Sequence, residues 1–271
     1  MNKTATKVLA LCAAAMMTLT ACTGNAPATE EEKPSDAAST ETKDEATDKK
    51  DEDKTADASA VTGKHEITDL VLPKLAQNEL TTFNILHSET NEDFEILFNL
   101  VEGLLEKDSL DKRHPCVATE WGTEDGGLNW TFKLRNDVKW VDMNGNVKAD
   151  CVADDFLTAL EWTLNFHKND SIGTSMPCQM IKGAQEYYDY TKGLSKEEAY
   201  ALTAGEGSKF REMVAVEAPD AYTLHYTCTA EKPYFDSLMS YTTGMPMSQA
   251  MIDELGGVDG VRAMNNENMW Y

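Results

Sequence analysis

Three short stretches of the sequence hold residues that could bind a metal ion or move a proton. The run DMNGN at residues 142–146 offers the oxygen ligands that calcium prefers, His65-Glu66 could begin a zinc-binding pair, and Asp154-Asp155 brings two carboxyl groups together. In the first run, glycine is fourth instead of sixth, and the twelfth residue is Ala153 where a calcium loop has glutamate. A hairpin turn explains that run better.

The other two stretches also lack what their chemistry requires. No second histidine follows His65-Glu66 at zinc-protease spacing, and the sequence shows no G-x-S-x-G, Walker or Rossmann glycine pattern and no nucleophile with a neighbouring base. Neighbouring residues on a helix point about 100° apart, so Asp154 and Asp155 are interpreted as charges at a helix start. We therefore expect no metal, no cofactor and no enzymatic activity. The remaining histidines are scattered: His87, His114, His167 and His225.

Residues 1–22 have the features of a secretory signal. Lys3 and Lys7 precede an apolar stretch, residues 8–19, that is too short to cross about 30 Å of hydrocarbon as a helix. The sequence LTAC that ends at Cys22 resembles a bacterial lipobox, in which the signal is cut before the cysteine and its thiol is diacylated. We expect Cys22 to be the lipid-attachment residue, which holds the protein on the extracytoplasmic face of the cell membrane. The alternative is an ordinary signal with an incidental cysteine.

Residues 23–62 contain almost no large apolar side chain. They hold 12 acidic and 5 basic residues and consist mainly of Ala, Thr, Asp, Glu, Lys, Ser and Pro. Such a segment cannot bury enough apolar surface to offset the entropy of ordering, so we expect a disordered acidic tether. The whole chain has a formal net charge of −23, which argues against nucleic acid as a partner and against direct adhesion to anionic lipid.

Residues 63–271 show alternating helix and strand patterns. Phe94, Leu97, Phe98, Val101 and Leu104 or Leu105 recur at helical spacing and predict one amphipathic helix, which begins near Thr90 or Asn91. A second helix has Phe156, Leu157, Leu160 and Leu164 on one side and Asp154 and Asp155 near its start. The run SKEE at residues 195–198 predicts a capping box, with Gly205 as the helix stop. Residues 233–239 and 248–255 look like short helices, and Gly256-Gly257 closes the latter.

Two hairpins complete the expected mixed α/β class. Trp130, Phe132 and Leu134 alternate with polar residues, and Val138 and Trp140 follow a turn at residues 136–137, so we expect one hairpin there. Residues 214–226 alternate around Pro219-Asp220 and predict a second. The widely spaced Cys116, Cys151, Cys178 and Cys228 contain no C-x-x-C pair; they could form disulfides in three connectivities or remain small buried thiols.

Several linked motifs in the folded part resemble the solute-binding family 5 receptors, the extracytoplasmic oligopeptide-binding proteins of ABC importers. They are PCVATEW at residues 115–121, DGG at 125–127, WTFKLR at 130–135, VKW at 138–140 and ADDF at 153–156, with further similarity at residues 100–104, 216–226 and 269–271. Two departures are FNI at residues 83–85, where many members have Leu-Asp-Pro, and NGN at residues 144–146, which lengthens the usual turn.

The resemblance implies a periplasmic-binding-protein-like (type II) α/β fold. Residues 63–271 would form its N-terminal lobe, with a core of residues 63–93 and 213–271 and an inserted subdomain of residues 94–212. Because members continue into a second lobe, we expect a truncated product whose second lobe is missing; a naturally single-lobed protein is the alternative.

The resemblance also implies capture of oligopeptides and their delivery to ABC permease subunits. An extended peptide is then held through its main chain. The implied ligand-binding residues are Ser88, Glu89, Thr90 and Asn91 in the loop before the first long helix, where a helix start favours a carboxylate, and Thr174, Ser175 and Met176 in the inserted subdomain. Thr90 and Asn91 could instead serve only as helix caps. Alternative functions are binding of nickel, haem or sugar by the same fold, a structural or adhesive surface lipoprotein, and a lipoprotein hydrolase.

Overall fold

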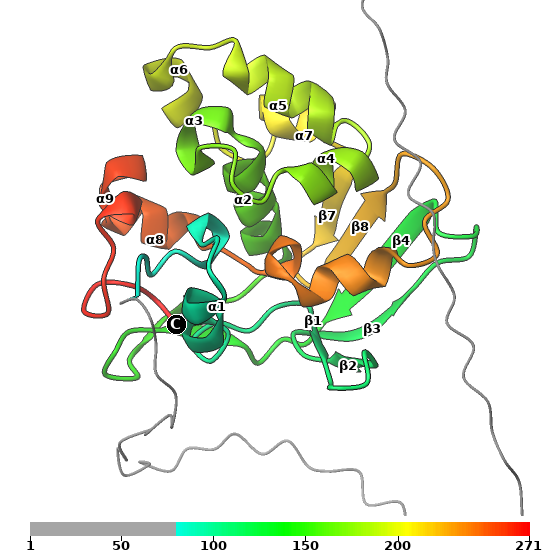
Figure 1. The fold of residues 1–271 in the computed structure, drawn as a ribbon, viewed down its shortest axis with the longest axis horizontal. Coiled ribbons are helices and arrows are strands. Elements are labelled where there is room, and N and C mark those ends of the chain that lie inside the picture. Colours follow the sequence, from blue (N-terminus) through cyan, green and yellow to red (C-terminus); the bar gives the residue numbers. More distant parts are fainter. Residues whose placement is uncertain (1–79) are drawn as a thin grey trace, which may run out of the picture. The chain divides into compact units, whose positions relative to one another are not determined.

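The structure, a computed structural model, describes residues 80–271. The predicted signal peptide, Cys22, the acidic tether and His65-Glu66 lie outside the described residues. Within the described part of the chain, no helix has the length and apolar character needed to cross a membrane. Figure 1 shows the arrangement of the elements.

Along residues 80–271, the strands β1–β6 are followed by the helices α2–α7 and then by the strands β7 and β8. The strands are β1 (Leu105–Lys107), β2 (Arg113–Pro115), β3 (Ala118–Gly122), β4 (Asn129–Leu134), β5 (Lys139–Val141), β6 (Val147–Asp150), β7 (Val216–Asp220) and β8 (Thr223–Thr227). The α-helices are α1 (Asn91–Leu97), α2 (Ala153–Leu164), α3 (Phe166–Asn169), α4 (Ser175–Met180), α5 (Ala184–Lys192), α6 (Lys196–Tyr200), α7 (Lys209–Met213), α8 (Gln249–Glu254) and α9 (Val258–Arg262). Three 3-10 turns are η1 (Ile85–His87), η2 (Phe235–Ser240) and η3 (Thr242–Gly244).

The main sheet is antiparallel, with strand order β3-β4-β8-β7. Along β4, the even-numbered residues Trp130, Phe132 and Leu134 are buried while Asn129 and Lys133 are exposed. This is the alternation expected of a strand with one covered face. Phe132 packs edge-on against Tyr226 of β8, with ring centroids 5.8 Å apart, and Phe235 of η2 covers both strands. The aromatic face therefore forms one side of the core.

Helix α2 packs against β7, the edge strand of the main sheet. Every residue from Asp155 to Leu164 is buried, which is why its sequence is apolar on more than one side. Helices α3, α5, α6 and α7 gather around α2 on the side away from β3, as Figure 1 shows. The sheet joins strands from both sides of residue 212, the predicted subdomain border, and their buried residues belong to one continuous core.

Two of the local predictions are wrong. The amphipathic helix is much shorter than expected: α1 ends at Leu97, and Leu105 begins a strand. Between the two, Gly103 lies against Gly244 and Met245, where even a Cβ would lie 3.0 Å from the Gly244 carbonyl oxygen. The expected β4–β5 hairpin is also absent from the described residues, since β4 pairs with β3 and β8 and β5 pairs with β6.

Other local predictions are confirmed. β7 and β8 form the predicted hairpin, although its turn is Ala221-Tyr222 and Pro219-Asp220 end β7. The predicted second helix is α2, which has Asp154 and Asp155 in its first turn as expected. Ser195 and Glu198 form the predicted capping box, although α6 ends at Tyr200 and not at Gly205. Helix α8 ends as expected, with the Gly257 amide donating to the Ile252 carbonyl at 2.8 Å.

The four cysteines of the folded part are free thiols. Cys151, Cys178 and Cys228 are buried, and Cys116 is half-buried. Burial raises the pKa of the Cys116 thiol to about 12, and the nearby carboxylate of Glu102 adds to the shift. Such thiols are poor nucleophiles at neutral pH and serve as small apolar side chains.

Candidate functional site

The first predicted binding segment, residues 88–91, lies between two short helical turns. Asn84 begins η1, and its Oδ1 accepts a hydrogen bond from the Leu86 amide at 3.0 Å. Thr90 begins α1, and its Oγ1 accepts from the Asp93 amide at 3.2 Å. Of the two residues proposed as caps for this helix, Thr90 is therefore the cap.

A buried carboxylate ties this segment together. Asp93 accepts hydrogen bonds from the Thr81 amide and the Ser88 hydroxyl, both at 2.9 Å, and from the Thr81 hydroxyl. Burial by itself raises the pKa of Asp93, but hydrogen bonds from Thr81, Ser88 and Thr90 outweigh that effect and hold the pKa below its ordinary value. The loop is consequently fixed around a permanent negative charge at neutral pH.

Of the four predicted residues of this segment, two have side chains that are engaged within the loop and two have side chains that are exposed. The side chains of Ser88 and Thr90 are occupied inside the loop, and Ser88 is buried. Glu89 and Asn91 are exposed and face solvent. Because α1 has only seven residues, its dipole adds little attraction for a carboxylate. Glu89, Asn91 and the backbone are thus the groups that a ligand could reach here.

The second predicted segment forms the start of α4. Thr174 is the N-cap residue, and its hydroxyl donates to the Ser171 carbonyl at 3.0 Å. Ser175 and Met176 are exposed, with 39% of Met176 accessible, whereas the next residue, Pro177, is buried. The helix is thereby anchored on one side and presents a hydroxyl and a thioether on the other.

The structure joins residues that precede the two segments in the sequence. Asn169, at the end of α3, donates a hydrogen bond from its amide nitrogen to the Leu86 carbonyl at 2.8 Å. His87 Nε2 lies 3.9 Å from a carboxylate oxygen of Asp170. This contact could not be predicted from the sequence, because Leu86 and Asn169 are 83 residues apart and neither belongs to a recognisable motif.

Comparison with known sequences identifies the family. A sequence model of the bacterial extracellular solute-binding proteins, family 5 (middle), matches residues 112–266, which is more than half of the chain. The chain belongs to this family. The match begins just before β2 and ends just after α9, so it covers the main sheet, the helices around α2 and the second predicted segment, but not residues 88–91.

Relatives of this family 5 chain share both sequence and fold with it. Oligopeptide-binding protein AmiA of Streptococcus pneumoniae is 28% identical over 170 residues, which are 62% of this chain and 23% of AmiA. The substrate-binding domain of an oligopeptide ABC transporter of Bacillus anthracis is 26% identical with a TM-score of 0.53, over 68% of this chain and 31% of that one. OppA of Haemophilus influenzae, solved in complex with the peptide RPPGFSPFR, is 26% identical with a TM-score of 0.50, over 65% and 30%.

These matches confirm the predicted mixed α/β fold of an OppA-type binding protein. This chain spans about a quarter to a third of the length of the proteins that it matches.

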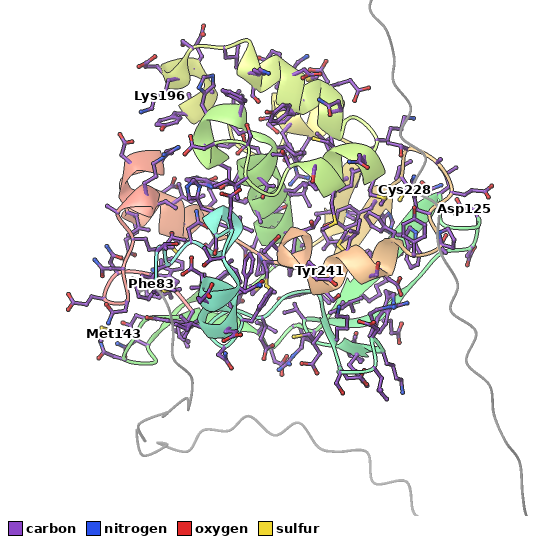
Figure 2. The ribbon with its side chains drawn as sticks, viewed as in Figure 1. Phe83, Asp125, Met143, Lys196, Cys228 and Tyr241 are labelled. Carbon is purple, nitrogen blue, oxygen red and sulfur yellow. The ribbon has the colours of Figure 1, made fainter. Side chains whose placement is uncertain are left out.

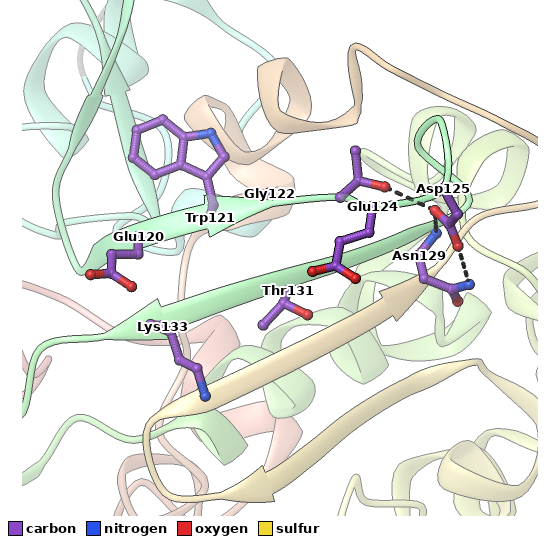
Figure 3. Close-up of a pocket in the computed structure, with 9 residues that line it drawn as sticks. Glu120, Trp121, Gly122, Glu124, Asp125, Asn129, Thr131 and Lys133 are labelled. Carbon is purple, nitrogen blue, oxygen red and sulfur yellow. Dashed lines mark hydrogen bonds between the residues drawn. The ribbon is translucent and has the colours of Figure 1, made fainter.

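A groove of about 570 Å³ on β3 and β4 is lined by residues of neither predicted segment. Figure 3 shows Glu120, Thr131 and Lys133 along these strands, and Asp125 and Asn129 at the turn that joins them. Asp125 accepts from the Asn129 amide at 2.9 Å and from its side chain at 2.7 Å, and these bonds lower the pKa of Asp125 to about 2. The groove was not predicted, because its polar residues resemble any solvated sheet face.

The run DMNGN forms the turn between β5 and β6, as predicted. One oxygen of Asp142 accepts from the amides of Asn144 and Asn146 at 2.9 and 3.0 Å, and the other accepts from the Asn146 side chain at 2.9 Å. Met143 lies at the exposed tip of this hairpin (Figure 2). Within residues 80–271, no group of three or more His, Cys, Asp or Glu side chains is placed to hold a metal ion.

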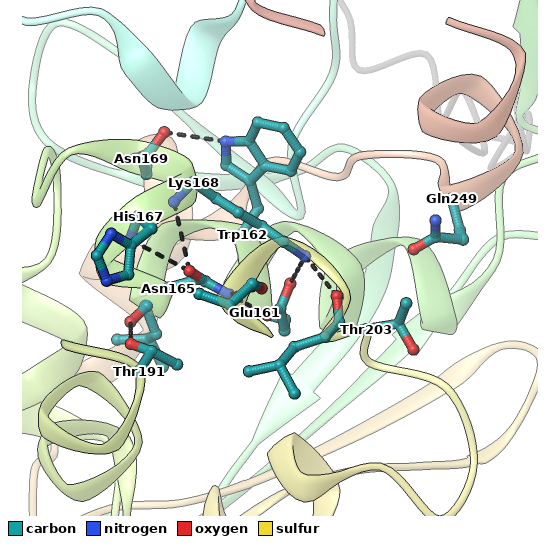
Figure 4. Close-up of polar contacts among 12 residues, drawn as sticks. Glu161, Trp162, Asn165, His167, Lys168, Asn169, Thr191, Thr203 and Gln249 are labelled. Carbon is teal, nitrogen blue, oxygen red and sulfur yellow. Dashed lines mark hydrogen bonds and ion pairs between the residues drawn. The ribbon is translucent and has the colours of Figure 1, made fainter. Parts of the chain in front are cut away.

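A buried ion pair joins the helices around α2. Lys168 Nζ lies 2.7 Å from Glu161 Oε2, and both side chains are almost fully buried. The other oxygen of Glu161 accepts from Tyr187 at 2.8 Å and from Asn165 at 3.0 Å, and Lys168 also donates to the Leu202 carbonyl. Figure 4 shows this cluster beside Trp162. Its members are engaged with one another, so it fixes helices α2, α3 and α5 in place.

Proposed function

We propose that this family 5 chain forms part of an extracytoplasmic receptor that captures oligopeptides and delivers them to the permease of an ABC importer, and that it is not an enzyme. The observation that carries the proposal is the family match over residues 112–266, together with relatives whose names describe oligopeptide binding. Residues 88–91 and 174–176 are proposed as two walls of the peptide site.

The chemistry of these walls suits a ligand of variable sequence. Glu89 and Asn91 are exposed polar side chains on a rigid loop, and they can bind the amide groups or the amino terminus that every peptide has. Met176 is an exposed, flexible thioether that adapts to different side chains. The walls thus combine fixed contacts to the main chain with an adaptable contact to side chains.

The same proposal includes the lipid anchor and the division into domains. Cys22 would attach the protein to the outer face of the membrane, and residues 23–62 would act as a flexible linker long enough for the receptor to contact the permease. Residues 63–271 would form the N-terminal lobe, with residues 94–212 as the inserted subdomain.

Calorimetric titration of the 271-residue chain with a pool of short peptides tests the proposal. Because this chain spans only about a quarter to a third of its relatives' length, we expect only weak binding. That binding should weaken at least about fivefold further in a Glu89→Gln, Asn91→Ala double variant, because a hydrogen bond to a charged group contributes about 1.5–3 kcal/mol. Asn99→Ala is the matched control: Asn99 is exposed just beyond the other end of α1, where it donates to the Glu95 carbonyl. Absence of saturable heat for every peptide up to millimolar concentration would refute the proposal.

A further inference from the structure

We propose that Asn169 is a positioning residue that fixes residues 88–91 and residues 174–176 relative to one another. That these segments bind peptide rests on the proposed function; that Asn169 couples them rests on the contacts of its own side chain.

Asn169 uses both ends of its amide to join three parts of the chain. Its Nδ2 donates to the Leu86 carbonyl at 2.8 Å and to the Ile172 carbonyl at 2.9 Å, and its Oδ1 accepts from Trp162 Nε1 at 3.0 Å. Figure 4 shows the bond to Trp162. Asn169 is fully buried and Trp162 almost so. Trp162 of α2 therefore fixes the Asn169 side chain, and that side chain in turn bonds the chain at Leu86 and at Ile172.

The chain that leads from Asn169 to the second segment is strained. Asp170 and Ser171 have φ values of +50° and +69°, a region of backbone conformation that residues other than glycine rarely adopt. Such conformations persist only where surrounding contacts enforce them. Two contacts do so here: the Asn169 side chain holds the Ile172 carbonyl, and Arg262 of α9 holds Asp170 at 3.0 Å. Beyond this turn, the Thr174 hydroxyl bonds back to the Ser171 carbonyl.

The first segment depends on the same amide. Leu86 is buried within η1, and its carbonyl accepts from Asn169 while its amide donates to Asn84. η1 ends at His87, next to Ser88, and the Thr90 amide donates to the Ser88 hydroxyl at 3.3 Å. A shift of η1 would therefore move the exposed residues Glu89 and Asn91, and the bond from Asn169 to Leu86 resists such a shift, while Asp93 holds the loop from the other side.

Asn165 provides a matched control on the same short helix. It is also a fully buried asparagine, but its Nδ2 donates to Glu161 at 3.0 Å and to the Ala199 carbonyl of α6 at 2.8 Å. Its Oδ1 also caps α3 by accepting from the His167 and Lys168 amides at 3.2 and 3.3 Å. Loss of Asn165 therefore disturbs the start of α3, whereas loss of Asn169 disturbs the end. Asn165→Ala thus reports general destabilisation, whereas Asn169→Ala reports the coupling of the two segments.

Hydrogen exchange in the full chain, without any peptide, is the first measurement. In Asn169→Ala the amides of Leu86, His87 and Ile172 should exchange at least about tenfold faster, because a buried carbonyl loses its donor. In Asn165→Ala they should stay within about twofold of wild type. If Asn169→Ala does not fold, Asn169→Ser serves instead, since it adds no buried charge and its single hydroxyl can donate to at most one of the two carbonyls. Unchanged exchange at these amides, or an equal rise in both variants, overturns the proposal.

Peptide titration of the same variants is the second measurement. Asn169→Ala should weaken binding about tenfold, and Asn165→Ala less than about threefold at a similar loss of stability. Equal weakening in both overturns the assignment of Asn169 as a positioning residue. If the wild-type chain binds no peptide while exchange responds as expected, the proposed function fails and the coupling through Asn169 stands.

Discussion

Replacing Asp155 by asparagine is expected to change how the stability of the protein depends on pH. Asp155 is buried at the start of α2, where one carboxylate oxygen accepts from Trp140 Nε1 at 2.9 Å and from the Val152 amide at 3.0 Å. Burial raises the pKa of Asp155 to about 6 despite these bonds, from an ordinary value of 3.8. The folded protein therefore takes up a proton at a higher pH than the unfolded chain does.

The sign and size of the effect follow from this difference. Between about pH 4 and pH 6 the folded state binds more protons than the unfolded state, so this group's contribution to the free energy of unfolding falls as pH rises. With a folded pKa of about 6 and an unfolded pKa of 3.8, the wild type should gain about 1.4 kcal/mol between about pH 7.5 and about pH 5 relative to Asp155→Asn. The comparison cancels the titration of other carboxyl groups.

Urea unfolding of both proteins, followed by tryptophan fluorescence and circular dichroism at several pH values, measures the difference. If the two stabilities change in parallel, within about 0.5 kcal/mol over this pH range, Asp155 is already protonated or freely solvated and the account of its burial is wrong.

Three further outcomes are expected. Thr90→Ala should lower the free energy of unfolding by about 1 kcal/mol, measured by urea denaturation, and no loss would contradict its role as the α1 cap. Lys168→Met should lower the free energy of unfolding by about 3–5 kcal/mol, because it leaves the Glu161 carboxylate buried without its partner. Adding Glu161→Gln should recover more than half of that loss, and a double variant no more stable than Lys168→Met would contradict this account of the pair. Cys22→Ala should release the protein from membranes into the medium, and retention after a carbonate wash would exclude the lipid anchor.

The sequence predicts the elements whose signals are local. The β7–β8 hairpin and α2 follow from alternation and helical spacing within a few residues, and the Ser195 capping box follows from four adjacent residues. The helix expected to reach Leu104 or Leu105 failed, because apolar residues at helical spacing also suit a turn followed by a strand, and only the packing of Gly103 on Gly244 decides between them.

Contacts between distant residues had no signal in the sequence. β4 was paired with its neighbour along the chain, whereas its second partner, β8, begins at Thr223. Asp154 and Asp155 were both interpreted as charges at a helix start; Asp154 is exposed and pairs with Arg211, but Asp155 is buried against Trp140. Asn169 was missed for the same reason, since its partner Leu86 precedes it by 83 residues.

Photo-crosslinking tests the central claim most directly, because it locates even a weakly bound ligand. Peptides that carry a benzophenone side chain at successive positions would be irradiated with the 271-residue chain, with unlabelled peptide as competitor, and the attachment sites mapped by mass spectrometry. The proposed function predicts competable crosslinks at residues 88–91 and 174–176, with Met176 prominent. Competable crosslinks confined to the groove that contains Glu120 and Lys133 would contradict it.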